Sequence, residues 1–239
     1  MKLQILAVVC GMSCLVLADD EFKQKVQVTK TEHVDFPSGG TVRLENSTGE
    51  LTVEGWDQPG VEMITVKSTK AEIASAGREN AFRALDRVRI AMERKGAELV
   101  ITTDFPRHRG FPPPSPLGSA TNFDLQYRIR VPRDTRLIVG HDVGEVHLDG
   151  LTSDIHATVL QGGITLRVPP EGQYVIDAKS DLGNVISDFP GSAKRRFWLV
   201  GHEFMQSSAA SHKLYLRDGF GDIIILKIRT PQTPPPLNR

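Results

Sequence analysis

The sequence predicts an all-β protein that folds as a repetitive β-solenoid, in a β-helix-like or β-roll-like form, with one short helix and a hairpin insertion. Two observations predict this class. A glycine followed two residues later by an aliphatic residue recurs at Gly144, Gly162, Gly183 and Gly221, and regular spacing indicates a stacked unit. Strict alternation of apolar and polar residues marks several strands. An antiparallel β-sandwich with evenly spaced turns is the alternative.

The N-terminus has the layout of a signal peptide. Residues 1–18 contain one charge, Lys2, followed by the apolar stretch Leu3–Leu17 and the small residue Ala18. This stretch is shorter than the roughly 20 residues that a helix needs to cross a bilayer. We therefore expect cleavage after Ala18 and an exported protein that is periplasmic, on the cell surface or extracellular. A lipoprotein signal is the alternative, but the residues before Cys10 and Cys14 are a poor lipid-attachment context.

Composition excludes several function classes for the exported chain. Both cysteines lie in the segment that we expect to be removed, so no disulfide, thiolate nucleophile or cysteine-ligated metal is expected. Loss of Lys2 leaves 28 basic and 29 acidic side chains, and this balance gives no electrostatic basis for binding nucleic acid. We also expect no transmembrane segment, because no second apolar run is long enough.

Residues 19–229 are expected to form a single β-rich domain. One helix is predicted between Ala71 and Asp86, with Gly77 as a point of interruption. A hairpin is predicted next, with strands at 88–92 and 99–103 joined by the turn Lys95-Gly96. The clearest strand is 123–131, in which apolar and polar residues alternate without a break, and it should stop at Pro132.

Two proline-rich segments are expected to contribute nothing to the core. Residues 106–120 contain Pro112-Pro113-Pro114 and three basic or imidazole groups, and are predicted to form an exposed, mobile loop. Residues 230–239 contain four prolines and are predicted to be a disordered tail.

The spacing of the repeat indicates how the chain stacks. The four glycines are separated by 18, 21 and 38 residues, and the last interval predicts a degenerate copy near Gly201. Gly40 and Gly49 carry the same pattern nine residues apart. Each unit, for example 137–148, is predicted to be a strand, a glycine-containing corner and a second strand. The aliphatic residues after each corner would point inward and stack on those of the units above and below.

A family resemblance follows from these segments. Residues 39–46, 49–56 and 61–67 resemble the opening of the bacterial putative adhesin domains of unknown function, and 137–166 is similar to their repetitive second half. The resemblance covers about residues 25 to 228. It implies a secreted or surface-associated β-solenoid without an established activity. Similar domains also occur joined to membrane segments in envelope-stress proteins.

The best candidate for a metal site surrounds a turn at Gly150. His147 and Asp149 share one strand face by parity, as do Asp154 and His156, so a turn could bring four ligands together. The more ordinary interpretation is that these are outward polar positions of alternating strands, and we expect no cofactor.

A stacked register would place Glu145, Asn184 and Asp222 in one outward column. Such a column could bind calcium or assist acid–base chemistry, but paired carboxylates do this only when burial separates their pKa values. The sequence also lacks a Gly-x-Ser-x-Gly elbow, a phosphate-binding loop ending in Lys-Ser or Lys-Thr, and a dinucleotide fingerprint in a βαβ setting. We therefore expect that this protein is not an enzyme.

A basic cluster precedes an aromatic strand. Lys194, Arg195 and Arg196 together with Trp198 could contact anionic glycan or lipid head groups. The alternative is a strand whose aromatic residues enter the core while the cations remain solvated. Trp56 is expected to be a core or end-cap residue rather than a sugar platform.

The functional hypothesis is a non-catalytic exported protein for binding, adhesion or envelope scaffolding, which presents a repetitive β surface to envelope glycan or to another protein. A carbohydrate-active enzyme on a β-helix scaffold is the first alternative, since that scaffold can carry acidic residues along a groove. An envelope-stress protein that acts through a protein partner is the second.

Overall fold

The structure is a computed structural model that describes residues 23–104, 123–195, 201–206 and 211–228. The expected signal peptide at 1–18, the proline-rich loop at 106–120 and the tail at 230–239 lie outside the described residues.

The described residues are almost entirely β-structure, with one short α-helix and one 3-10 turn. In chain order the elements are β1 (Gln27–Val34), β2 (Thr41–Thr48), β3 (Glu50–Trp56), β4 (Val61–Thr69), η1 (Ser75–Gly77), α1 (Arg78–Asp86), β5 (Arg89–Lys95), β6 (Glu98–Asp104), β7 (Phe123–Pro132), β8 (Arg136–Asp149), β9 (Ile155–Val168), β10 (Tyr174–Leu182), β11 (Val185–Ser187), β12 (Ser192–Arg195), β13 (His202–Gln206), β14 (His212–Phe220) and β15 (Ile223–Lys227).

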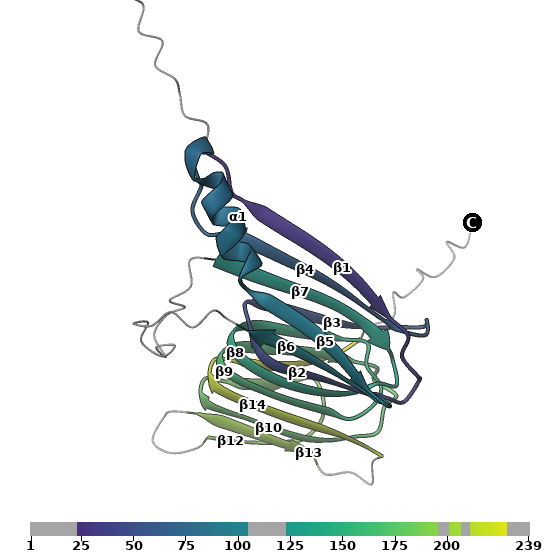
Figure 1. Cartoon of the computed structure of the whole chain (residues 1–239). Coiled ribbons are helices and arrows are strands. Elements are labelled where there is room, and N and C mark those ends of the chain that lie inside the picture. Colours follow the sequence, from purple (N-terminus) through teal and green to yellow (C-terminus); the bar gives the residue numbers. More distant parts are fainter. Residues whose placement is uncertain (1–22, 105–122, 196–200, 207–210, 229–239) are drawn as a thin grey trace, which may run out of the picture.

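The strands form one large mixed sheet that folds over on itself, so that two halves enclose one core (Figure 1). The front half-sheet has the order β5-β6-β2-β8-β9-β14-β10-β13-β12, and the back half-sheet has the order β1-β4-β7-β3-β8-β9-β15-β11. Strands β8 and β9 belong to both halves because each bends at its middle. Leu137 and Val139 before the bend of β8, and Val146 and Leu148 after it, are all buried in this core.

Glycines form the corners where the chain passes from the front half-sheet to the back half-sheet. Gly144 of β8 pairs in parallel register with Gly162 of β9. A Cβ on Gly162 would overlap the carbonyl oxygen of Gly144, and both residues have positive φ angles of 149° and 128°. Glycine is required there both for its backbone conformation and for the close approach of the next corner. Gly49, Gly221 and Gly183 occupy the equivalent corners. A Cβ on Gly221 or Gly183 would meet the glycine of the neighbouring corner, and a Cβ on Gly49 would meet the Leu125 carbonyl.

The spatial order of the corner units differs from their order in the sequence. The unit β14–β15 lies between β9 and the unit β10–β11, because β14 pairs in parallel with both β9 and β10. The long interval between Gly183 and Gly221 is therefore not a missing repeat. Gly201, where we predicted a degenerate copy, instead precedes β13, which pairs antiparallel with β10. That prediction is wrong, because residues between these glycines form the antiparallel strands β12 and β13 that extend the front half-sheet.

The other predicted elements match with one adjustment. The hairpin is β5–β6 and the alternating strand is β7, which ends at Pro132. The helix is shorter than predicted, because residues 71–74 are used otherwise: Ile73 pairs with Gln24 through N–H to carbonyl distances of 2.8 and 3.2 Å, and the carbonyl of Ala71 accepts a hydrogen bond from Thr69 Oγ1 at 2.8 Å. In the described residues no helix is long and apolar enough to cross a membrane.

Candidate functional site

Five outward residues of the front half-sheet form a group that we call the front cluster: Arg43, Arg136, His156, Tyr215 and Arg217. Tyr215 of β14 is in register with His156 of β9. His156 is in register with Ile138 of β8, which is in register with Arg43 of β2. Alternation turns the neighbours Leu214 and Leu216 into the core and leaves Tyr215 and Arg217 on the surface. Parallel pairing thus gathers residues from four separate chain segments.

Aromatic and cationic contacts hold the centre of the front cluster together. The rings of His156 and Tyr215 have centroids 4.4 Å apart, and the guanidinium carbon of Arg217 lies 3.7 Å from the centre of the Tyr215 ring. The Arg217 guanidinium also pairs with Asp177 at 2.8 Å. A cation over an aromatic face is favourable, because the ring carries negative charge density on its faces. Tyr215 and Arg217 are therefore held in fixed positions.

The front cluster carries positive charge that is only partly compensated. Arg43 pairs with Glu98 at 2.8 Å, but the exposed Arg136 side chain has no hydrogen bond or ion pair to any residue that the structure describes. Burial lowers the pKa of His156, and the nearby Arg217, Arg136 and Arg43 lower it further. The imidazole is therefore neutral at neutral pH, and the local field favours an anionic group beside Arg136.

A pocket of about 450 Å³ adjoins the front cluster on the side of the glycine corners. Arg217 borders it, together with Thr158 and Lys179 in the same row, and Gly140 and Gly219 line it without side chains that could fill it. The carboxylates of Glu45, Asp142 and Asp181 also line the pocket. This combination suits a polar ligand that both donates and accepts hydrogen bonds.

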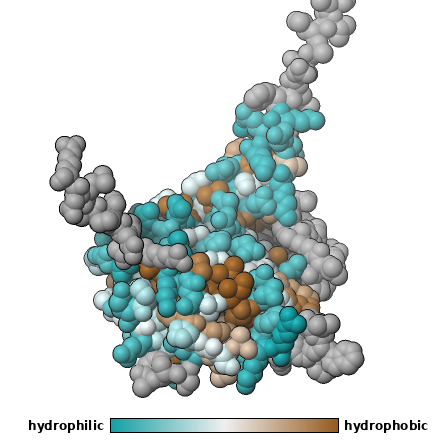
Figure 2. Space-filling view, turned by 180° about the vertical axis from the view of Figure 1, so that it is seen from behind, coloured by the Kyte–Doolittle hydropathy of each residue, from teal (hydrophilic) through white to brown (hydrophobic). Residues whose placement is uncertain are grey.

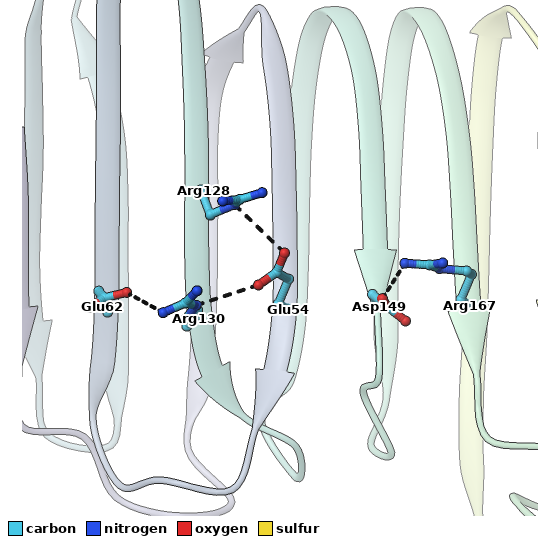
Figure 3. Close-up of polar contacts among 6 residues, drawn as sticks. All are labelled: Glu54, Glu62, Arg128, Arg130, Asp149 and Arg167. Carbon is cyan, nitrogen blue, oxygen red and sulfur yellow. Dashed lines mark hydrogen bonds and ion pairs between the residues drawn. The ribbon is translucent and has the colours of Figure 1, made fainter. Parts of the chain in front are cut away.

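The back half-sheet carries charges that neutralise one another (Figure 3). Arg130 of β7 lies between Glu62 of β4 and Glu54 of β3, with nitrogen–oxygen distances of 3.1 and 3.5 Å, and Arg128 pairs with the same Glu54 at 3.7 Å. Arg167 of β9 pairs with Asp149 of β8. We call these six residues the back ladder: Glu54, Glu62, Arg128, Arg130, Asp149 and Arg167. Its three acids and three arginines leave no net charge for a ligand.

The face seen from behind also has a hydrophobic area within a hydrophilic surround (Figure 2). On the outer face of β11 and β15, Ile186 is 56% exposed and lies in register with the half-exposed Ile224. Among the strands that the structure describes, β11 pairs only with β15.

The predicted metal ligands are not brought together. His147 and Asp149 lie on the outer face of the back half-sheet, whereas His156 lies on the outer face of the front half-sheet, so the core separates them. The carboxylate of Asp149 forms an ion pair with Arg167, and the carboxylate of Asp154 accepts a hydrogen bond from the backbone N–H of Lys213 at 2.9 Å. No group of three or more metal-ligating side chains occurs within the ranges that the structure describes. The turn that was expected to unite the four residues connects the two half-sheets instead.

The acidic column is partly formed. The carboxylate of Asp222 accepts hydrogen bonds from the Asn184 backbone N–H at 2.7 Å and side-chain amide at 3.2 Å. Glu145 lies beside Gly163, where a Cβ would approach both the Glu145 carboxylate and the Asp222 carbonyl, the latter at 3.3 Å.

The sequence interpretation missed a third carboxylate near this column, Asp218. Burial raises its pKa to about 7, and Glu145 and Asp222 raise it too, against the effect of the Phe220 backbone amide. The side chain faces the core and the residue is 2% exposed. Asp218 is also among the residues that line the pocket of about 450 Å³, but both of its carboxylate oxygens are buried.

Half of the predicted basic cluster can be placed. Lys194 and Arg195 are exposed on β12, which lies at one end of the front half-sheet among the described strands. Arg196 and Trp198 lie outside the described residues.

The sequence alone did not single out the front cluster, although His156 was named for another role. Two signals were present: the alternation of 212–220, which sets Tyr215 and Arg217 on one face, and the alternation of 155–160, which sets His156 outward. What was missing was the pairing of β14 with β9, because Leu214 and its register partner Ile155 lie 59 positions apart in the sequence. Sequence spacing gives no information on such a long-range register.

No family model and no curated protein matches this chain. Among solved structures, a putative cell adhesion protein from Clostridium sporogenes is 13% identical with a TM-score of 0.48, covering 84% of this chain and 100% of that one. A putative adhesin from Bacteroides fragilis is 9% identical with a TM-score of 0.26, covering 83% of this chain and 97% of that one.

A putative lipid binding protein from Parabacteroides distasonis is 9% identical with a TM-score of 0.19, covering 84% of this chain and 97% of that one. Structures similar to this chain thus include proteins named as adhesins, the class that the sequence resembles.

Proposed function

We propose that this protein is an exported, non-catalytic binding protein that attaches to an acidic envelope glycan through the front cluster. The parallel stack of glycine corners acts as a short β-solenoid, and its outward rows form the binding surface. The observation that carries the proposal is the exposed guanidinium of Arg136, which has no partner among the described residues and lies beside a neutral imidazole and two further arginines.

Three features support a glycan as the ligand. Guanidinium groups bind carboxylates with two parallel hydrogen bonds. The rings of His156 and Tyr215 offer flat apolar surface next to these cations. The adjoining pocket mixes carboxylates, a lysine and a threonine hydroxyl, which match the donors and acceptors of sugar hydroxyl groups. The ligand would lie across β2, β8, β9 and β14.

Binding is favoured over catalysis by the position of the carboxylates. Glycoside hydrolysis needs two carboxyl groups on either side of a bound sugar, one of them with a raised pKa. Asp218 has the raised pKa but faces the core at 2% exposure. Asp222, on the outer side, is bound to Asn184.

The proposal is tested by measuring how the purified protein binds an immobilised polyuronate and neutral dextran. Arg136→Gln should weaken polyuronate binding about tenfold, the equivalent of about 1.4 kcal/mol, and should reduce its dependence on salt. Arg128→Gln is the matched control: it removes the same charge from the back ladder, and binding should stay unchanged.

Two results would overturn the proposal. One is an absence of polyuronate binding at low ionic strength. The other is an equal loss of binding in the Arg136 and Arg128 variants, which would indicate a net-charge effect without a site. Capture of a protein partner by the back face, with the front variants unaffected, would favour the protein-partner hypothesis; the exposed Ile186 on the edge strand β11 is the observation behind that second candidate.

A further inference from the structure

Four chain connections meet at the end of the molecule where β3 and β7 finish: those from β1 to β2, β3 to β4, β7 to β8 and β8 to β9. Trp56, the last residue of β3, is in register with Pro132, the last residue of β7. The connection from β3 to β4 contributes Asp57 and Pro59, and the connection from β1 to β2 contributes Ser38. Together they enclose a pocket of about 390 Å³, separate from the front cluster. We call it the Trp56 pocket.

The floor of the Trp56 pocket is apolar and rigid. It is lined by the indole of Trp56 and the rings of Pro59 and Pro132. The indole N–H donates to the carbonyl of Gly60 at 3.2 Å, and the carbonyl of Trp56 accepts from the backbone N–H of Arg133 at 3.3 Å. The indole is therefore fixed in place, and little conformational entropy is lost when a ligand covers it.

The rim of the Trp56 pocket is polar and held in place by hydrogen bonds. Arg133 donates to Asp57 through two nitrogens at 2.6 and 3.3 Å, and its third donor group reaches the carbonyl of Gly150 at 3.2 Å. The hydroxyl of Ser38 donates to the carboxylate of Asp134. Each carboxylate oxygen keeps a further lone pair.

The charges of the rim discriminate between ligand classes. Arg133 compensates Asp57, and its hydrogen bonds lower the pKa of that carboxyl, which stays ionised. Asp134 then leaves one surplus negative charge beside the pocket. The exposed Gln58 adds an amide that can both donate and accept. A neutral ligand with many hydroxyl groups fits this rim, whereas an acidic ligand is repelled.

We infer that the Trp56 pocket binds one neutral pyranose ring, with the apolar face of the sugar on the indole and its hydroxyl groups on Asp57, Gln58 and Asp134. This gives the half-buried Trp56 the role of sugar platform in place of the core or end-cap role that its sequence position suggested. The pocket is of the size of small-molecule sites, about 300–1,000 Å³. This site is independent of the acidic-glycan site on the front cluster, and lies at the end of the back half-sheet.

The sequence offers a direct readout, because the chain has two tryptophans, Trp56 and Trp198. In a Trp198→Phe background, tryptophan fluorescence reports on Trp56 alone. We expect methyl glucoside, methyl mannoside, methyl galactoside or N-acetylglucosamine to give a saturable change, with half-saturation at roughly 1–10 mM for the best of them. Glucuronate should bind at least about fivefold more weakly.

Two variants locate the response. Gln58→Ala should weaken binding by about fivefold or more without altering the circular dichroism spectrum, because the side chain is exposed, and Gln173→Ala is the control at another exposed glutamine. Asp134→Asn should reduce the discrimination against glucuronate.

The inference is overturned if none of the four neutral sugars gives a saturable change up to about 100 mM, or if the change persists undiminished in Gln58→Ala. Polyuronate binding by the same proteins, and its loss in Arg136→Gln, is measured in parallel. The two proposals can therefore fail separately.

Discussion

Several polar residues are buried at the glycine corners, where each needs a hydrogen-bond partner. Ser47, His141, Asp218 and Ser180 are at most 2% exposed, and lie near one another on neighbouring units. His141 Nε2 lies 3.0 Å from the Gly49 carbonyl oxygen, and Ser180 Oγ donates to the Gly221 carbonyl at 2.7 Å. Each thus reaches the corner carbonyl of the adjacent unit, which would otherwise be unsatisfied.

Asp218 occupies the same place in its own unit, where the Phe220 backbone amide favours the ionised carboxyl but makes no hydrogen bond of normal geometry to it. Neither of its oxygens has a hydrogen bond to a described residue. A Cβ on the neighbouring Gly221 would lie 2.9 Å from Asp218 Oδ2 and would overlap the Gly162 carbonyl oxygen. A carboxyl that is buried without such a hydrogen bond favours its neutral, protonated form, which agrees with a pKa of about 7.

The first prediction concerns Asp218→Asn. The carboxyl has a pKa of about 7 in the folded protein and an ordinary value of 3.8 when unfolded, so the unfolded chain loses a proton that the folded chain keeps. Stability from this group is therefore complete below about pH 4 and lost as the pH rises to about 7. Asn has nearly the same shape and carries no charge, and should raise the free energy of unfolding at pH 7.5 by about 2–4 kcal/mol.

Urea unfolding at several pH values between about 4 and 7.5 measures this effect. Asp35→Asn, at an exposed carboxylate, serves as the control. If the difference between wild type and Asp218→Asn does not grow with pH, the carboxyl is not neutral in the folded protein.

The second prediction concerns His141, whose titration has the opposite sign. Burial lowers its pKa from 6.5 to about 4, so its contribution to stability is present above about pH 6.5 and is lost as the pH falls towards 4. As the pH rises from about 4 to about 7, the stabilisation from His141 increases while that from Asp218 decreases. The two changes therefore offset each other in the wild type. His141→Asn should therefore leave a free energy of unfolding that falls steeply with rising pH, by about 2–3 kcal/mol relative to wild type.

The same urea series checks this prediction, since only the slope with pH is compared and a lower absolute stability does not matter. A slope in His141→Asn equal to that of the wild type would contradict it.

At the scale of elements, the corner glycines decide whether neighbouring strands can approach. Gly162→Ala would place a Cβ against the Gly144 carbonyl and force a positive φ on alanine. Gly96, in the β5–β6 turn, also has a positive φ, of 64°, but its Cβ would have nothing within 4 Å. We expect Gly96→Ala to cost about 1 kcal/mol and Gly162→Ala at least about 3 kcal/mol, because only the second adds a clash.

Thermal or urea unfolding of the two variants separates the cost of a positive φ on alanine, which both share, from the cost of the steric clash, which only Gly162→Ala has. Equal costs would mean that the corners tolerate a wider spacing, and that the glycines are needed for φ alone.

The back ladder is expected to matter little at this scale. Arg130 is 39% exposed, and its partners Glu54 and Glu62 are 33% and 16% exposed. Such pairs contribute about 0.2–1 kcal/mol and weaken with salt. Arg130→Gln should thus lower the free energy of unfolding by less than about 1 kcal/mol, with a smaller loss at about 1 M NaCl. A loss of several kcal/mol would show that the ladder holds β3, β4 and β7 together.

For the whole molecule, export is the property that the N-terminal residues predict. Sequencing of the exported product should find Asp19 as its first residue, after cleavage behind Ala18. Retention of residues 1–18, or a lipid on Cys10 or Cys14, would contradict this.

The sequence by itself determined the local features of this protein. Alternation fixed the strands β5, β6 and β7, and the glycine pattern located the corners of β8, β9, β10–β11 and β14–β15, because both depend on a few adjacent residues. The helix was placed too early, since the pairing of Ile73 with Gln24 joins segments that are distant in sequence.

Only the tertiary structure decided which units are neighbours. It set β14–β15 between β9 and β10–β11, and so brought Tyr215 to His156, separated His156 from His147 across the core, and buried Asp218. Any two units with glycine corners and inward aliphatic residues can stack. The order among them therefore depends on the packing of the whole core, which no local pattern encodes.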